Sequence, residues 1–234
     1  MDRKYILATD GIDVDGHTLH RIKAIRGFGR IKPGDLGGFV EYEDNLSHGG
    51  DCWISHDAHV YGDAHVYDNA WIAEFAQVYG NAKVYGNSWV TDRAQIFGDA
   101  HVCGHAWVNE QAMVYENAMV FGDAHVCGYA RVYGFSQIYG DARVSGNARV
   151  YGEARIFEKA QVYADAMISN DALVFGDAHI GGCAWICGDA RIGDNNYIHI
   201  RGKIKVDHGI WTRQIDIDHK WYLVSSTLEK ILVE

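Results

Sequence analysis

Proline and paired cysteines are scarce in this chain. Pro33 is the only proline among 234 residues, whereas glycine occurs 27 times. Because each proline removes a backbone hydrogen-bond donor, this balance is typical of many tight turns between fully hydrogen-bonded strands. The five cysteines are odd in number and contain no Cys-x-x-Cys pair. This argues against a disulfide framework and against a zinc site, so we interpret the cysteines as free thiols.

Long hydrophobic runs and an excess of positive charge are also lacking. The apolar stretches are short and interrupted by Gly, Asp or Asn, and the start of the chain has no long apolar segment of a secretory signal. We therefore expect no membrane segment and no export, and we predict a cytoplasmic location. The formal net charge is −10. Direct nucleic-acid binding is not expected, because neutralising phosphates requires a basic surface.

A six-residue repeat fills the centre of the sequence. Over residues 54–198 every sixth residue is Val or Ile, and a small residue, nearly always Ala, stands two positions before it. Side chains two residues apart lie on the same face of a strand, so each hexapeptide is predicted to be a short strand plus a turn. Pairs such as Gly62-Asp63 and Gly80-Asn81 follow these strands. Such residues tolerate the left-handed backbone of a sharp corner.

A second period, of eighteen residues, indicates three sides. The residue before Val or Ile is tryptophan at Trp53, Trp71, Trp89 and Trp107. The residue after it is aromatic at the same spacing in two further columns, which begin at Tyr61 and Tyr67. A coil of three hexapeptides returns to the same side every eighteen residues, whereas hairpins do not. We predict an all-β, three-sided parallel β-helix of about eight coils, in which like side chains stack ~4.8 Å apart.

This pattern resembles the hexapeptide-repeat superfamily, to which trimeric acyltransferases belong. The resemblance rests on residues 54–198, with their aliphatic residue at every sixth position and the small residue two before it. It implies a left-handed parallel β-helix. It also implies that an enzyme of this kind would bind acyl-CoA and use a histidine at a subunit boundary as general base. The chain departs from the family in having Tyr or Phe so often just after the aliphatic residue.

We predict capping segments at both ends of the solenoid, because parallel coils leave raw strand edges that repeat proteins must block. Residues 1–53 are assigned to an N-terminal β-hairpin and entry cap, residues 54–198 to the β-helix, and residues 199–234 to a C-terminal strand and short-helix cap.

Within the first cap, residues 5–25 predict a hairpin that turns at Asp15-Gly16, followed by a Gly-rich turn over residues 34–41. In the second cap, residues 198–206 alternate as a strand, and Ser226 with Glu229 suggests a capping box for a last helical turn. The entry segment GDLGGFVE resembles that of bacterial and phage-borne β-helix proteins, which implies a phage or prophage source.

The tryptophans are the candidate binding residues. Four indoles on one side would bury roughly 600 to 1,000 Å² if covered. Left bare, they exceed what a soluble monomer usually exposes. They are predicted to seat a capping segment of the chain, another subunit or an external partner. The candidate residues are Trp53, Trp71, Trp89 and Trp107.

No catalytic residue, metal ligand or cofactor is assigned. His65 and His101 flank Lys83 in one column, and His125 and His179 lie on the tryptophan side. No loop interrupts the repeat to shape an acceptor pocket, so we interpret these histidines as solvent-facing. A column of corner residues could offer oxygen ligands to calcium, but we interpret it as a solvated row of turns. Its members are Asp63, Asn81, Asp99, Asn117, Glu153, Asp171 and Asp189.

The sequence therefore favours a non-catalytic binding or scaffolding protein. Its flat aromatic sides are predicted to contact a partner protein or a second copy, with a homotrimer as one form of self-association. The first alternative is a hexapeptide-type acyltransferase, supported only by the resemblance. The second is a phage inhibitor of a host factor. An ice-binding role is disfavoured, because regular outward rows of Thr are missing.

Overall fold

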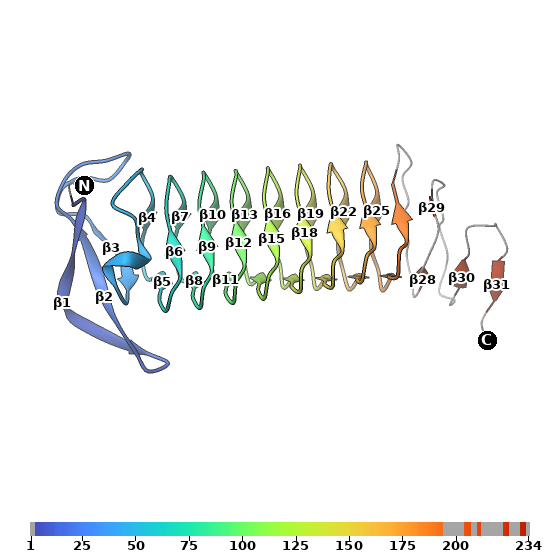
Figure 1. The fold of residues 1–234 in the computed structure, drawn as a ribbon, viewed down its shortest axis with the longest axis horizontal. Coiled ribbons are helices and arrows are strands. Elements are labelled where there is room, and N and C mark those ends of the chain that lie inside the picture. Colours follow the sequence, from blue (N-terminus) through green and yellow to red (C-terminus); the bar gives the residue numbers. More distant parts are fainter. Residues whose placement is uncertain (1–2, 194–203, 207–209, 212–221, 225–229, 233–234) are drawn as a thin grey trace. The chain divides into compact units, whose positions relative to one another are not determined.

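The fold is built almost entirely from strands and turns. The computed structural model describes residues 3–193 and short strands at 204–206, 210–211, 222–224 and 230–232 (Figure 1). The chain divides into two compact units, residues 1–116 and 117–234. Within the described residues the helical structure is limited to a single 3-10 turn, Glu43–Asn45. The division at residues 53/54 and 198/199, which follows the repeat pattern, stays a prediction.

An antiparallel hairpin begins the first unit, as predicted. Strand β1 (Tyr5–Val14) pairs with β2 (His17–Ala24). The two turn residues, Asp15 and Gly16, have φ values of 52° and 86°. A two-residue hairpin turn of the type that matches strand twist needs positive φ at both positions, and Asp-Gly supplies it.

The segment after the hairpin differs from the prediction. Residues 36–40 do not form a Gly-rich turn but strand β3 (Leu36–Val40), which pairs antiparallel with β2 and parallel with β5 (His59–Val60). The glycines instead let neighbouring segments of the chain pack closely against β3. A Cβ on Gly38 would lie 2.5 Å from the carbonyl oxygen of Ala58, and one on Gly37 would lie 2.4 Å from Ile22 Cγ1. Strand β3 thus joins the antiparallel cap to the parallel coils.

Three parallel sheets make up the coils of the first unit. Consecutive strands of a sheet are one coil apart, so that Trp71 pairs with Trp89 and Lys83 with His101. The first sheet continues from β3 and β5 with β8 (Gln77–Val78), β11 (Gln95–Ile96) and β14 (Met113–Val114). The second holds β4 (Trp53–Ile54), β7 (Trp71–Ile72), β10 (Trp89–Val90) and β13 (Trp107–Val108). The third holds β6 (His65–Val66), β9 (Lys83–Val84) and β12 (His101–Val102).

The second unit repeats this arrangement. One sheet holds β16 (His125–Val126), β19 (Arg143–Val144), β22 (Gln161–Val162) and β25 (His179–Ile180). Another holds β17 (Arg131–Val132), β20 (Arg149–Val150), β23 (Met167–Ile168), β26 (Trp185–Ile186) and β28 (Ile204–Val206). The third holds β15 (Met119–Val120), β18 (Gln137–Ile138), β21 (Arg155–Ile156), β24 (Leu173–Val174), β27 (Arg191–Ile192) and β29 (Ile210–Trp211).

The core is the column of repeat residues predicted from the sequence. The Val, Ile and Ala side chains of the hexapeptides are fully buried in both units, and Ser88 and Ser136 take the place of Ala. Each serine hydroxyl donates to a backbone carbonyl, as Ser88 Oγ does to Tyr85 at 2.8 Å. Buried polar groups need such partners. The predicted parallel β-helix is confirmed, with about nine coils in the two units together against about eight predicted. The left hand of the coil stays a prediction taken from the resemblance.

Corner residues satisfy backbone groups of the next coil. Gly62 and most corner glycines have positive φ, but several corners place an acid in this conformation, such as Asp92 with φ 59°. The carboxylate of such an acid accepts a backbone hydrogen bond. Asp92 Oδ2 accepts the N–H of Glu110 at 3.0 Å, and Glu158 Oε2 accepts that of Gly176 at 2.8 Å. A carboxylate thus caps a corner amide eighteen residues further along the chain.

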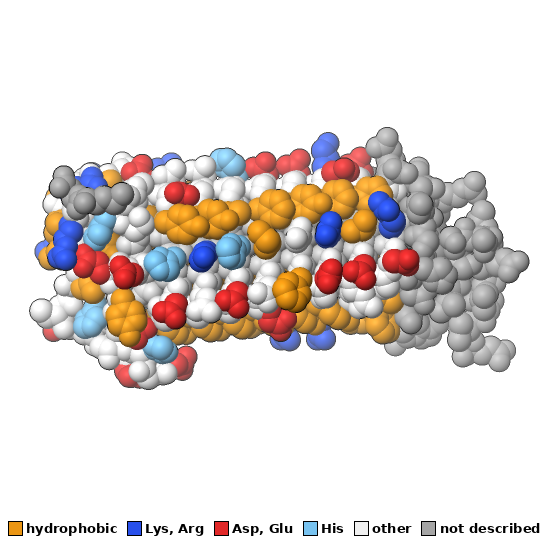
Figure 2. Space-filling view, in the orientation of Figure 1, with side chains coloured by type: hydrophobic (Ala, Val, Ile, Leu, Met, Phe, Trp, Pro, Cys, Tyr) orange, Lys and Arg blue, Asp and Glu red, His pale blue; other side chains and the backbone are white. Residues whose placement is uncertain are grey.

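Aromatic side chains stack in rows within each unit. In the first unit the Tyr61, Tyr79 and Phe97 rings follow one another at centroid distances of 5.1 and 4.9 Å and are nearly parallel. In the second, Tyr139 lies 4.9 Å from Phe121 and 5.0 Å from Phe157. Hydrophobic rows alternate with charged and polar ones on the side shown in Figure 2. The stacking supports the predicted eighteen-residue period.

The C-terminal expectations are only partly covered by the described residues. Residues 198–203 of the expected strand, and both Ser226 and Glu229 of the expected capping box, lie outside them. Lys230–Leu232, where we predicted the end of a helical turn, form strand β31, which pairs antiparallel with β30 (Tyr222–Val224). That part of the prediction is wrong. Antiparallel pairing occupies backbone groups that the edge of β30 would otherwise expose.

Acid should destabilise the first unit through His59. Its Nδ1 atom is buried without a hydrogen-bond partner. Burial lowers the pKa of His59 below its ordinary 6.5. The unfolded chain therefore takes up the proton at higher pH than the folded chain, and the free energy of unfolding falls as pH drops below about 6.5. We expect the fall to be smaller for His59→Gln, because a glutamine side chain takes up no proton in this pH range. Glutamine is the chosen replacement because Gln77 occupies the paired position on β8. Urea unfolding at pH 7.5 and 5.0 measures this, and equal acid losses in both proteins would contradict it.

Candidate binding surface on the tryptophan side

The tryptophans stand in one row because of their place in the repeat. Each is the first residue of a two-residue strand whose second residue, Ile or Val, points into the core, so each indole points outward. The strands pair in register, which places the indoles one coil apart. The structure thus brings together the four predicted residues, Trp53, Trp71, Trp89 and Trp107.

The N-terminal cap covers the first of them. Trp53 is only 1% exposed. Its ring meets those of Phe28 and Tyr5 edge to face, at centroid distances of 5.4 and 6.4 Å. The Tyr5 hydroxyl in turn donates to the carbonyls of Glu43 and Leu46 at 2.7 and 2.8 Å. Trp53 is therefore part of the packing between cap and coils, and a partner cannot reach it.

The remaining tryptophans stay accessible. Trp71 is half-buried and stacks on Trp89 at 6.1 Å with an interplanar angle of 29°. Trp89 and Trp107 are 44% and 46% exposed. The Trp107 Nε1–H donates to Thr91 Oγ1 at 3.3 Å, which fixes the orientation of that indole. We call Trp71, Trp89 and Trp107 the Trp surface. A cap therefore covers one end of the row and leaves a flat aromatic surface beyond it.

One edge of the Trp surface carries a row of acidic residues. Glu74, Asp92 and Glu110 occupy successive corners, all with positive φ. The next corner position holds Phe75, which is 56% exposed, with the Arg93 guanidinium 5.9 Å from its ring centroid. The exposed area of these aromatic side chains is on the order of 300 Å², a size at which apolar patches on monomers are often functional.

The histidine row has the predicted spacing. His65, Lys83 and His101 pair in register on β6, β9 and β12. Burial and the neighbouring Lys83 ammonium lower the pKa of His101, and Asp99 opposes them. The Tyr85 ring lies edge to face with His101 at 6.1 Å. His65 and Lys83 are exposed.

The acidic corners form hydrogen-bonded rows. Asn81 Nδ2 donates to Asp99 Oδ1 at 2.9 Å, and Asn147 Nδ2 donates to Asp165 Oδ1 at the same distance. Within the described part of the chain, no group of three or more His, Cys, Asp or Glu side chains is arranged to hold a metal ion. None of the helical structure in the described residues is long and apolar enough to cross a membrane.

A buried ammonium that anchors the cap was not predicted from the sequence. Lys4 is fully buried; its Nζ donates to the Cys52 carbonyl at 2.8 Å and lies 3.2 Å from Cys52 Sγ and 4.9 Å from the Phe28 ring centroid. Burial lowers the pKa of Lys4 and raises that of Cys52. Two more carbonyls, of Gly49 and Gly50, accept from the same ammonium at 3.4 Å. Carbonyls surround this ammonium, so its role is structural.

Exposed aromatic corners were also missed. Phe75, Tyr129 and Phe135 stand where most hexapeptides have Asp, Asn or another polar residue, and all three are well exposed. The exception to the corner pattern is visible in the sequence itself. Whether such a side chain folds back onto the coils depends on its neighbours in space. Its exposure therefore cannot be predicted from the sequence.

Comparison with known proteins supports the repeat architecture. The family described as YdcK Beta solenoid repeat matches residues 76–92 and 136–152. The first stretch includes Trp89, and the second includes Arg143 and Arg149. No curated protein matches the chain. These matches cover a small part of the sequence, so what they support is a β-solenoid repeat protein.

Proposed function

We propose that this chain is a non-catalytic β-solenoid that binds a partner protein through the Trp surface. The observation that carries the proposal is the pair Trp89 and Trp107, each nearly half exposed although the cap of the same chain covers Trp53. Tryptophan is among the residues most enriched in interface hot spots. A row of indoles on rigid, hydrogen-bonded strands presents this area with little conformational entropy to lose on binding.

The charge around the surface favours an external partner. Glu74, Asp92 and Glu110 lie along it, and the whole chain carries a net charge of −10. Two copies that met with these acidic edges aligned would place like charges against each other, and like charges across an interface disfavour association. We therefore infer a partner with an apolar contact area and basic residues around it.

A tryptophan double variant tests the proposal. We expect Trp89→Ala with Trp107→Ala to change the free energy of unfolding by no more than about 1 kcal/mol, because both side chains are half exposed. Partner affinity should fall at least about 30-fold, the value of a single hot spot of 2 kcal/mol. The matched control is His65→Ala with Lys83→Ala, two exposed residues on another side of the same coils.

The partner is best sought by photo-crosslinking in the source cells, with p-benzoylphenylalanine at position 107 and, as control, at position 65. An adduct specific to position 107 that disappears with Trp89→Ala supports the proposal. Identical adducts at both positions would refute it. Sedimentation of the double variant adds a separate outcome: release of monomers from a wild-type oligomer would assign the surface to self-association.

A further inference from the structure

Two aromatic corners of the second unit are exposed without a structural reason. Tyr129 and Phe135 are 59% and 64% exposed. Their amides donate to the carbonyls of Gly146 and Gly152, both at 2.7 Å. The polar corner residue Asn147 makes the equivalent bond, to Ala164 at 2.7 Å. The corner therefore folds equally well with asparagine, and the fold does not require the rings.

These corners bracket a strand that carries an arginine. Strand β17 lies between them, and its outward residue is Arg131. Arg131 pairs in register with Arg149 of β20, so the two side chains start ~4.8 Å apart on the same side. Both are exposed, and among the described residues neither forms an ion pair. Like charges on neighbouring strands destabilise a sheet, so this pair works against the stability of the unit.

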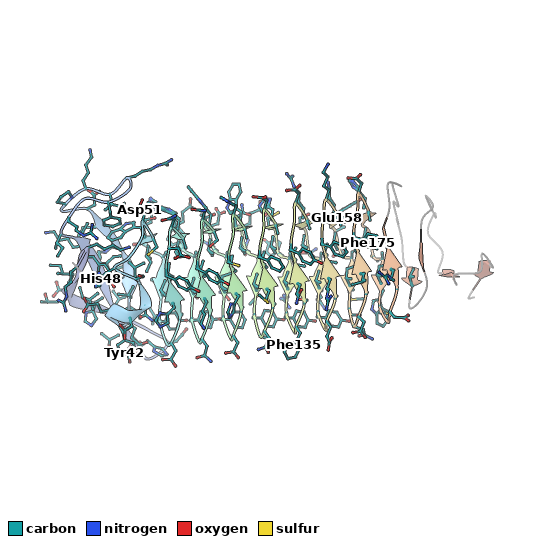
Figure 3. The ribbon with its side chains drawn as sticks, turned by 45° about the horizontal axis from the view of Figure 1, so that its top comes forward. Tyr42, His48, Asp51, Phe135, Glu158 and Phe175 are labelled. Carbon is teal, nitrogen blue, oxygen red and sulfur yellow. The ribbon has the colours of Figure 1, made fainter. Side chains whose placement is uncertain are left out.

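A shallow hollow adjoins the second aromatic corner. It has a volume of ≈ 230 Å³ and is lined by Phe135, Gln137, Glu153 and Arg155. Phe135, one of the lining residues, projects from its corner (Figure 3). Arg155 is the exposed outward residue of β21, one coil on from Gln137. We call Tyr129, Arg131, Phe135, Arg149 and Arg155 the aromatic–arginine patch.

We propose that the aromatic–arginine patch is a second docking surface, which binds an acidic segment of a partner protein. Arginine and aromatic residues are the types enriched at protein interfaces. Guanidinium groups without an ion pair are best matched by carboxylates, which they bind through paired hydrogen bonds. A small ligand is a poorer match, because the rings stand on convex corners and small-molecule sites are concave.

A second copy of the chain is also a poorer match. Contact of the patch with itself across a two-fold axis would place arginines against arginines. Contact with an acidic surface elsewhere on a second copy would have to overcome the net charge of −10 on each chain. The observations therefore favour an external partner that supplies carboxylates around an apolar side chain.

Substitutions that copy the repeat itself provide the test. Tyr129→Asn with Phe135→Asn installs the residue found at the Asn147 corner, and Arg131→Gln with Arg149→Gln installs the residue found at Gln137 and Gln161. We expect both double variants to melt at the wild-type temperature or above it, the arginine variant because it removes like-charge repulsion. A lower melting temperature in both would show that these side chains serve the fold, and would overturn the proposal.

A displayed library of random 12-residue peptides serves as the binding probe. Peptides are selected on the intact chain and depleted on a variant with all four substitutions. We expect the survivors to be rich in Asp and Glu and to contain an aromatic or large aliphatic residue. In fluorescence anisotropy, Arg131→Gln with Arg149→Gln should weaken their binding at least tenfold. The control Arg191→Gln, an exposed arginine two strands beyond Arg155 in the same sheet, should leave it unchanged.

Two outcomes would overturn the proposal at this stage. The first is a survivor pool without net negative charge, or no survivors at all. The second is a wild-type oligomer that the Tyr129→Asn, Phe135→Asn variant converts to monomers in sedimentation, which would make a second copy the occupant. The Trp surface is tested separately, since Trp89→Ala with Trp107→Ala should leave binding of the selected peptides intact.

Discussion

Replacing Asn45 with aspartate should lower the free energy of unfolding by about 3 to 5 kcal/mol, the range measured when a buried charge is left without a partner. Asn45 is buried in the 3-10 turn and has all its polar groups satisfied. Its Oδ1 accepts the N–H groups of Glu41 and Tyr42 at 3.2 and 2.8 Å. Its Nδ2 donates to the carbonyls of Gly62 and Ala64 at 2.8 and 2.9 Å.

The substitution keeps the shape of the side chain and reverses half of its hydrogen bonding. In Asn45→Asp a carboxylate oxygen would face two carbonyl oxygens, and neither could donate. Chemical denaturation monitored by tryptophan fluorescence measures the loss. Asn87→Asp is the matched control, because its exposed Oδ1 accepts from Asn69 Nδ2 at 3.0 Å and an aspartate keeps that acceptor. Equal stability of the two variants would show that the entry turn contributes little to the first unit.

Deleting Asn147 alone should abolish cooperative unfolding of the second unit. An additional residue can be pushed out at a corner, but a missing one leaves a turn too short to close, and every later residue moves to the opposite face. Each buried aliphatic residue contributes roughly 1.5 to 3 kcal/mol. Together they are comparable with, or exceed, the roughly 5 to 15 kcal/mol that keeps a typical domain folded. The residues displaced are Val150, Ile156, Val162, Ile168, Val174, Ile180, Ile186 and Ile192.

Removing a whole coil is the control. Deletion of residues 141–158 takes out eighteen residues, so both the inward face and the side of every later residue are kept. We expect this shorter chain to stay soluble and to melt cooperatively. Circular dichroism and differential scanning calorimetry compare the two deletions. If the single-residue deletion melted like the eighteen-residue deletion, the fold would not depend on the six-residue period.

The coils could be predicted because both of their periods are local in the sequence. The inward row and the Gly62-type corners follow from side-chain alternation and backbone sterics, and the structure has them. The Gly37-Gly38 pair was misassigned as a turn because glycines favour turns in general. Here they admit Ala58 and Ile22 at close range, contacts that depend on distant parts of the chain.

The sequence predicts which residues form the candidate site, but not which of their side chains are exposed. The sequence places four tryptophans in one row, whereas burial of Trp53 depends on how Tyr5 and Phe28 fold over it. The same limit applies to Tyr129 and Phe135, whose exposure follows from the absence of a covering segment in the described residues. The acyltransferase and phage-inhibitor alternatives came from resemblance, and no observed contact favours either. They stay predictions, the first testable by acyl-CoA titration.

The constant distance between paired strands has a consequence for how the chain acquires its fold. Within each unit, consecutive coils pair residues eighteen positions apart, as in Trp71 with Trp89 or Arg131 with Arg149. Closing each new coil thus requires a loop of the same short length. The entropic cost of loop closure therefore does not grow with the length of chain already folded. The hairpin and β3 precede the coils in the chain and are synthesised before them, so the edge of β3 is available for pairing with the emerging coils. We expect folding to advance coil by coil during translation, with the cap as its template.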